Sequence, residues 1–287
     1  MTESTTNTET PNEDTPNEDA VNEDAVTVAK APRVSVIIPV APKQAYLEET
    51  LLSVQKQTFP DWEVVLVLDG ECGENRRAAS VLPPEQLQIV LTARPRSGIA
   101  AARNAGLPVC RGDLVAFCDG DDLCEPERLA RQVAEFDRRP ALGMLATWSR
   151  RFDSDTGADL GPRRCPSGSD ALARKLLLFN TVTVSTVMAR PEIVREAGNF
   201  RDAAIQCEDY DLWLRILGRA EVDALPEELV RYRVHDGQFS HRAKIMPRSG
   251  LLRREKLAAA RRLGWSVPVA RVKHLAWVGV QLANRRF

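Results

Sequence analysis

The sequence predicts an α/β protein with a Rossmann-like, mostly parallel central sheet and helices on both faces. Two observations carry this prediction. Short apolar runs rich in β-branched residues alternate with helical patterns between residues 34 and 117, and several runs are apolar without a break. Parallel strands that are covered by helices on both faces have such uninterrupted apolar sequences. Because ligands of such sheets bind beyond the carboxyl ends of the strands, the turns that follow the strands are the first place to look for a site.

Each expected element rests on a local pattern. Apolar residues spaced by three and four between residues 46 and 55 predict a helix, which ends before Pro60. Small residues at 99–106 favour a second helix packed closely on the sheet, and Asp209 opens an amphipathic helix whose Leu212, Trp213 and Ile216 face the core. Four continuous apolar runs predict strands at residues 34–40, 63–68, 87–91 and 114–117.

The two ends of the chain carry opposite charges. Residues 1–30 hold eight acids and one Lys, whereas residues 242–287 hold twelve Lys or Arg and one Glu. The repeated Asn-Glu-Asp unit lacks apolar surface, so residues 1–32 are expected to form a disordered acidic tail. Residues 33–240 are expected to be one folded domain, followed by a basic helical extension at 241–287.

The extension leaves two interpretations open. Leu275, Val278 and Leu282 lie on one helical stripe, with Trp277 beside it. A helix of this kind packs on the domain with its basic residues outward, or it contacts an anionic membrane surface peripherally.

Composition excludes some classes of function. The net charge of −1 speaks against a nucleic acid partner. Six cysteines without a C-x-x-C pair, and only three His, give poor spacing for a zinc site. The acidic, polar N-terminus does not resemble a signal peptide, so we expect reduced thiols and a cytoplasmic location.

Three carboxylates follow the fourth expected strand, at Asp119, Asp121 and Asp122, with Gly120 between them. Like charges this close raise one another's pKa, and a bound divalent cation relieves the repulsion. Hard oxygen ligands suit Mg²⁺ or Mn²⁺, which commonly bridge to phosphates. The alternative is a solvated acidic turn.

Two further segments carry weaker signals. Glu208-Asp209-Tyr210-Asp211 begins a helix, and its acids are equally consistent with an N-cap and with a general base. Ser97-Gly98 leads into a small-residue helix with a single Arg103, which suits bidentate phosphate binding. The segment is neither a P-loop nor a dinucleotide-binding fingerprint.

Taken in order, the motifs over residues 33–240 resemble the family 2 glycosyltransferases, which have the GT-A fold. The similar segments are Val34-Ser35-Val36-Ile37-Ile38-Pro39, Ser53-Val54-Gln55-Lys56-Gln57-Thr58-Phe59, Ala102-Arg103-Asn104-Ala105-Gly106, Arg111-Gly112-Asp113, Asp119-Gly120-Asp121-Asp122 with Pro126, Glu208-Asp209 and Tyr232-Arg233-Val234-His235. The resemblance implies a metal-dependent, inverting transfer of a sugar from a nucleotide-sugar to an acceptor hydroxyl by a catalytic domain at 33–240.

The resemblance also implies roles for individual residues. Asp69 would read the base of a uridine nucleotide, and Asp119 would hold the ribose or the metal. Asp121 would ligate Mn²⁺ or Mg²⁺, and Asp209 would deprotonate the acceptor. His235 completes the metal site or is structural. The remaining nucleotide-sugar contacts are expected from Pro39, Gly98, Arg103 and Gly120.

The sequence departs from the family pattern in two places. One of the family's two acids is missing at Leu68-Asp69-Gly70-Glu71, and Val40-Ala41-Pro42 replaces the usual loop after the first strand. Both differences affect the expected contacts to the nucleotide.

Two other classes of function stay open from the residues alone. A phosphatase of the haloacid-dehalogenase kind also places D-x-D after a strand, although Leu123 stands where that class has Thr or Val and three strands precede the motif. A non-catalytic nucleotide-binding protein is the third alternative. The transferred sugar and the acceptor have no signature in the sequence.

Overall fold

The protein is represented by a computed structural model that describes residues 1–2, 31–238 and 249–283. Contacts divide the chain into Met1–Lys30 and Ala31–Phe287, and the fold is that of the second unit. Most of the predicted acidic tail, residues 3–30, lies outside the described residues, as do residues 239–248 and 284–287 of the predicted extension.

The described residues form a nine-stranded sheet of order β3-β2-β1-β4-β8-β6-β9-β5, with β7 paired to β6. The strands are β1 (Val34–Val40), β2 (Trp62–Leu68), β3 (Leu87–Leu91), β4 (Leu114–Phe117), β5 (Leu123–Cys124), β6 (Leu142–Asp153), β7 (Asp159–Arg163), β8 (Met188–Ala189) and β9 (Glu221–Val234). All four predicted strands are confirmed, and only the second begins one residue earlier than expected, at Trp62.

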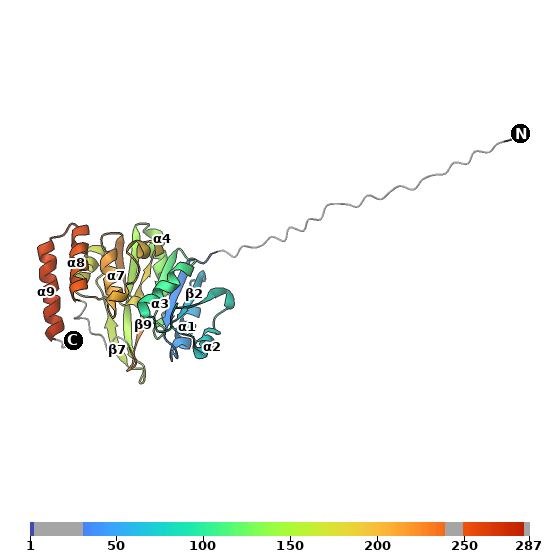
Figure 1. The fold of residues 1–287 in the computed structure, drawn as a ribbon, viewed down its shortest axis with the longest axis horizontal. Coiled ribbons are helices and arrows are strands. Elements are labelled where there is room, and N and C mark those ends of the chain that lie inside the picture. Colours follow the sequence, from blue (N-terminus) through green and yellow to red (C-terminus); the bar gives the residue numbers. More distant parts are fainter. Residues whose placement is uncertain (3–30, 239–248, 284–287) are drawn as a thin grey trace. The chain divides into compact units, whose positions relative to one another are not determined.

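The first half of the sheet is parallel. β3, β2, β1 and β4 pair in this way, whereas β8 pairs antiparallel with both β4 and β6. The long strands β6 and β9 pair in parallel again, and the short β5 lies antiparallel on β9. The predicted α/β class is therefore confirmed, with antiparallel strands added on the side of the sheet built by the later part of the chain (Figure 1).

Helices cover the sheet on both faces. The α-helices are α1 (Leu47–Gln55), α2 (Gly73–Ala79), α3 (Ile99–Gly106), α4 (Arg128–Arg138), α5 (Ser169–Leu176), α6 (Pro191–Glu196), α7 (Glu208–Ile216), α8 (Ser249–Arg262) and α9 (Val267–Ala283). Short 3₁₀ turns lie at η1 (Pro84–Gln86), η2 (Leu107–Val109), η3 (Val184–Thr186) and η4 (Asp202–Ala204).

Burial of both faces explains the uninterrupted apolar runs. Val64 and Leu66 of β2 belong to a core with α1 and α4, whereas the alternating residues Val65 and Val67 belong to a second core with α3, α5, α7, α8 and α9. Successive side chains of a strand point to opposite faces, so every position of β2 is apolar except Glu63. Glu63 is buried and accepts hydrogen bonds from Ser35 and Arg111.

The parallel register brings the acidic turns to one edge. Val40 is paired with Leu68, and Ile37 with Phe117, so β1, β2 and β4 end close together. The backbone N–H of Asp69 donates to the carbonyl of Val40 at 2.9 Å. Asp69 and the acids that follow β4 therefore share the carboxyl edge of the sheet.

The basic extension forms α8 and α9, which pack on the α7 side of the sheet. Trp277 of α9 is buried in the core, whereas Leu275 is 67% exposed and Leu282 also faces outward. α9 therefore packs on the domain through one face, which contains Trp277, and exposes a second face, which contains Leu275. Among the described residues, no helix is long and apolar enough to cross a membrane.

Candidate active site

Asp69 organises the loop that precedes α3. Its Oδ1 accepts hydrogen bonds from the Ser97 N–H at 2.7 Å and the Thr92 hydroxyl at 2.9 Å, and its Oδ2 accepts from the Gly98 N–H at 2.8 Å. Gly98 has φ +94°, a conformation that glycine adopts at little cost. Each carboxylate oxygen has two lone pairs, so Oδ2 keeps the capacity to accept one more hydrogen bond.

The acidic turn after β4 lies directly against β1. A Cβ built on Gly120 would come within 2.6 Å of Val40 Cγ1 and 3.6 Å of the Pro39 carbonyl oxygen, so only glycine fits this close approach. Pro39 itself is buried within β1, behind the turn. Gly120 and Pro39 thus lie where the turn packs against β1.

Arg103 joins the acidic turn to the start of α7. Its guanidinium is 2% exposed and donates to Asp119 Oδ1 at 2.8 Å and to Glu208 Oε1 at 3.0 Å. Burial alone lowers the pKa of Arg103, and the two carboxylates raise it above its ordinary value. Residues far apart in the sequence, from the turn after β4, from α3 and from α7, are thus held in one ion-pair network, although no single motif places them together.

The end of β9 supports the other side of the turn. His235 Nε2 lies 3.1 Å from Asp121 Oδ2, and the His235 ring meets the Tyr46 ring edge-on at 5.1 Å. Arg233 donates from Nε to the Asp121 carbonyl and from its backbone N–H to Asp122 Oδ1. The structure therefore places two of the three predicted metal ligands, Asp121 and His235, in contact with each other.

Asp209 lies in the first turn of α7, next to Glu208. The N-cap residue is Cys207, so Asp209 does not take the N-cap position, although its Oδ1 accepts a hydrogen bond from the Tyr210 N–H at 2.6 Å. Its Oδ2 accepts from Asn180 Nδ2 at 3.0 Å. Burial, and then the charge of Glu208, raise the pKa of Asp209 to about 6 against the opposing effect of Arg103.

The same physical causes act on Asp121. Burial, and then the charge of Asp119, raise its pKa, and His235 opposes the shift. A divalent cation would remove this repulsion, and the carboxylates and the imidazole are ligands that Mn²⁺ accepts. Within the described residues, no group of three or more Asp, Glu, His or Cys side chains converges as a preformed metal site. Since Mg²⁺ and Mn²⁺ take several ligands from waters and phosphates, two or three protein ligands are sufficient, and the residues fit.

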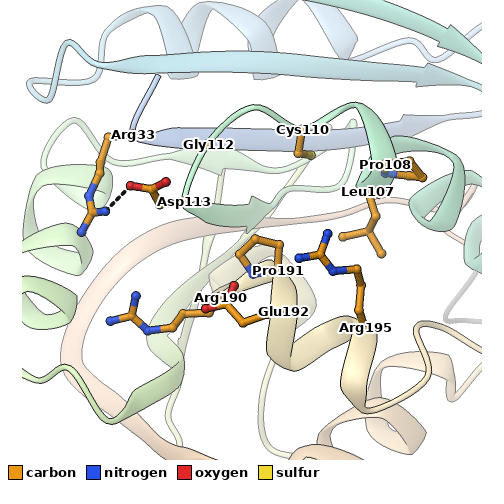
Figure 2. Close-up of a pocket in the computed structure, with 10 residues that line it drawn as sticks. All are labelled: Arg33, Leu107, Pro108, Cys110, Gly112, Asp113, Arg190, Pro191, Glu192 and Arg195. Atoms are coloured by element: carbon orange, nitrogen blue, oxygen red, sulfur yellow. Dashed lines mark hydrogen bonds and ion pairs between the residues drawn. The ribbon is translucent and has the colours of Figure 1, made fainter. Parts of the chain in front are cut away.

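A pocket lies away from these acids. It has a volume of about 450 Å³ and is lined by residues that include Arg33, Asp113, Arg190 and Arg195 (Figure 2). Arg33 and Asp113 precede β1 and β4, so this pocket opens near the amino ends of strands whose carboxyl ends carry the acids. It shares no residue with the predicted site.

Comparison with known proteins identifies the class to which this fold and site belong. Residues 35–191 match the family described as Glycosyl transferase family 2, so the chain belongs to this family and is a glycosyltransferase. The chain is 30% identical over 202 residues to the amylovoran biosynthesis glycosyltransferase AmsE of Erwinia amylovora. The aligned region covers 70% of this chain and 75% of AmsE. This membership confirms the family indicated by the motifs and disfavours the phosphatase and the non-catalytic binder.

Solved structures show the GT-A fold. S. aureus TarS 1-349 in complex with UDP-GlcNAc is similar with a TM-score of 0.68 at 18% identity, covering 88% of this chain and 73% of that one. The mannosyltransferase PcManGT of Pyrobaculum calidifontis, in complex with GDP-Man and Mn²⁺, has a TM-score of 0.57 at 20% identity, covering 89% of this chain and 76% of that one. The predicted GT-A architecture is confirmed.

Two features of the site were not predicted from the sequence. Asn180 lies 29 positions before Asp209, in a turn without periodicity, and only its polarity after the apolar run Leu176-Leu177-Leu178-Phe179 marks it. The second is Glu208 as the partner of Arg103, because the sequence pattern indicated phosphate as the ligand of this arginine.

Proposed function

We propose that this glycosyltransferase moves a sugar from a UDP-sugar to an acceptor hydroxyl with inversion at the anomeric carbon. The observation that carries the proposal is the bridge of Arg103 between Asp119, on the acidic turn, and Glu208, next to Asp209. It holds the donor side and the acceptor side of a transfer reaction in one rigid unit. Residues 33–240 form the catalytic domain in this proposal.

Asp209 acts as the general base. Its carboxylate takes the proton of the acceptor hydroxyl, whose oxygen attacks the anomeric carbon from the face opposite the diphosphate. The bond between that carbon and the phosphate oxygen breaks, and UDP leaves with the electron pair. One base on the acceptor side and a leaving group on the other give a single displacement, and hence inversion.

On the donor side, Asp121, Asp119 and His235 would hold Mn²⁺ or Mg²⁺, which supplies electrostatic stabilisation of the charge on the departing diphosphate. Asp69 accepts a hydrogen bond from the ring N–H of uracil through the free lone pair of Oδ2, and the Gly98 N–H holds that oxygen in place while the Ser97 N–H holds Oδ1. Guanine also offers a ring N–H, and PcManGT was solved with GDP-Man, so the choice of base needs a direct test.

A donor panel tests the proposal. Release of nucleoside diphosphate from UDP-sugars and GDP-sugars is measured with a mixed acceptor extract, in Mn²⁺ and in EDTA. We expect UDP release from at least one UDP-sugar, dependent on metal. Release of inorganic phosphate would indicate the phosphatase instead, and binding without turnover would indicate a non-catalytic nucleotide-binding protein.

The raised pKa of Asp209 predicts the pH dependence of turnover. A carboxyl with a pKa of about 6 is protonated, and inactive as a base, below that pH. Turnover should therefore rise as the pH increases through about 6 and be lost as the pH falls through it. A profile of kcat between pH 4.5 and 8.5 checks this expectation, and a turnover that stays flat across this range would contradict it.

The outward face of α9 fits an anionic membrane surface, which we propose as a peripheral contact of the enzyme. This face consists of Val269, Val272, Leu275, Val280 and Leu282, and Val272 is 65% exposed. From residue 249 to 283 the one acid is Glu255, which is buried and paired with Arg201. Two copies of this positive surface would repel each other, whereas anionic headgroups attract it and the apolar stripe enters their interface.

Vesicle sedimentation tests the membrane contact. The protein is expected to bind vesicles that contain phosphatidylserine, to bind phosphatidylcholine vesicles weakly, and to be released by salt. Val272→Asp with Leu275→Asp should abolish binding, whereas Leu160→Asp, a change at an exposed apolar residue of β7, should not. Equal binding by both variants, or a salt-resistant dimer that needs Leu275, would rule the membrane contact out.

A further inference from the structure

Two side chains from separate helices hold the end of α5 and the turn that follows it. The Tyr210 hydroxyl of α7 donates to the Leu176 carbonyl at 2.6 Å, and Lys256 Nζ of α8 donates to the Leu178 carbonyl at 3.1 Å. Two residues further on, Asn180 donates from Nδ2 to the Asp209 carboxylate at 3.0 Å. The turn thus reaches the candidate base from a part of the chain that none of the sequence motifs includes.

The orientation of the Asn180 amide is determined by its other end. Asn180 Oδ1 accepts a hydrogen bond from the Val182 N–H at 3.2 Å, while Nδ2 faces Asp209. A flipped amide would place its oxygen against a carboxylate and its NH₂ group against a backbone donor, which loses both hydrogen bonds. The amide therefore donates to Asp209 whenever Asp209 is ionised.

Lys256 is an unusual anchor for this turn. It is fully buried, and its ammonium lies over the Trp277 ring at 4.7 Å and the Tyr210 ring at 5.5 Å. A buried ammonium is costly unless it is hydrogen-bonded, and aromatic faces offset part of this cost. The Leu178 carbonyl supplies this hydrogen bond. Because the buried Lys256 ammonium has to be hydrogen-bonded, its bond to Leu178 ties the turn to α8.

We propose that Asn180 is a positioning residue for Asp209, and that Lys256 of the C-terminal helices fixes the turn that presents it. This inference rests on the proposed role of Asp209 as the base. Asn180 holds one carboxylate oxygen, so that the acceptor hydroxyl meets the carboxylate in one orientation. The C-terminal helices then serve the catalytic centre through this turn, besides their packing on the core.

Several charged groups surround Asp209, and each affects its titration. Glu208 lies beside it on α7 and disfavours its ionised form, whereas Arg103 of α3 favours it. Lys256 of α8 lies over the ring of Tyr210, the residue that follows Asp209. The Asn180 hydrogen bond also favours the carboxylate, so its removal should make Asp209 harder to ionise.

The first test is Asn180→Ala, with Asn180→Asp as an isosteric second variant. Loss of the hydrogen bond should move the acidic limb of kcat up by about one pH unit, which lowers turnover about tenfold at pH 5 and little at pH 8. Asn180→Asp should move the acidic limb of kcat further up, because a second carboxylate then faces Asp209. Donor KM should stay close to wild type in both.

Direct titration gives a readout that does not depend on activity. With carboxyl-¹³C aspartate, the Asp209 signal is assigned by its loss in Asp209→Asn, and its midpoint should rise in both Asn180 variants. An unchanged midpoint with an unchanged kcat limb would overturn the role of Asn180. Failure of the proposed function is a separate result, because it would appear as full turnover of Asp209→Asn with the best donor of the panel.

Lys256→Met tests whether Lys256 fixes the turn that presents Asn180, and Arg262→Met on the same helix is the matched control. Arg262 of α8 also donates to carbonyls, but to Leu214 and Leu217 at the far end of α7. Lys256→Met should raise the Asp209 midpoint and the acidic limb in the same direction as Asn180→Ala. Arg262→Met should lower the melting temperature without moving either. Equal shifts in both variants, or none in Lys256→Met, would show that α8 contributes only stability.

Discussion

Replacement of Asp209 by Asn is expected to lower turnover by about 10²–10⁴-fold, because the acceptor proton then has no destination in the transition state. Donor affinity should stay near wild type, since the proposed base contacts the acceptor and not the nucleotide. Asn keeps the shape of the side chain and can accept from the Tyr210 N–H, so α7 should remain folded. Single-turnover transfer and donor titration measure the two quantities separately.

Asp211 provides the matched control for this substitution. It lies two residues further along α7, is fully buried, and pairs with Arg215 at 2.8 Å. Asp211→Asn should therefore lower the melting temperature and leave the pH limb of turnover in place. If Asp209→Asn turned over like wild type, Glu208 would be the remaining acid of this turn to test. Its Oε2 has no hydrogen-bond partner among the described residues, whereas the two oxygens of Asp211 face Arg201 and Arg215.

Replacement of Asp121 by Ala is expected to weaken UDP binding in the presence of Mn²⁺ by about 100-fold, the upper end of the losses seen when a metal's supporting residues are removed. The reason is that the diphosphate would be held largely through the cation, which Asp121 ligates in the proposed site. Isothermal titration of UDP in Mn²⁺ and in EDTA measures the effect for the wild type and the variant.

Asp113→Asn is the control for Asp121. This acid stands at the opposite end of β4 and pairs with Arg33 at 2.6 Å, away from the acidic turn. Its replacement should leave UDP binding unchanged. Equal UDP affinity of the wild type in Mn²⁺ and in EDTA would remove the metal from the proposal and leave Asp121 without a role in donor binding.

The parts of the fold that follow from local pattern were predictable. Strands buried on both faces read as continuous apolar runs, and parallel strands bring their carboxyl ends together, so Asp69 and Asp119 could be placed at one edge. The pairing of β6 with β9 could not, because their contacts join residues about 80 positions apart and include register shifts. Such pairing is decided by tertiary packing.

The candidate site shows the same limit. Residue type and position indicated Arg103 as a ligand for phosphate, yet its guanidinium holds two carboxylates. Asp69 was expected to read a base, and its oxygens first order the backbone at Ser97 and Gly98. Asn180 had no signal beyond its polarity after an apolar run, because its partner is 29 residues away. Sequence pattern locates charged groups near a site, and only the fold shows what they hold.

The anomeric configuration of the product tests the central claim most directly. A single base at Asp209, facing a diphosphate leaving group, requires one displacement and therefore inversion. With an α-linked UDP-sugar from the donor panel, proton NMR of the newly formed linkage should show the β-anomer from the first turnover. Formation of the α-anomer would contradict the account, because retention needs either a second displacement or attack from the face of the departing UDP.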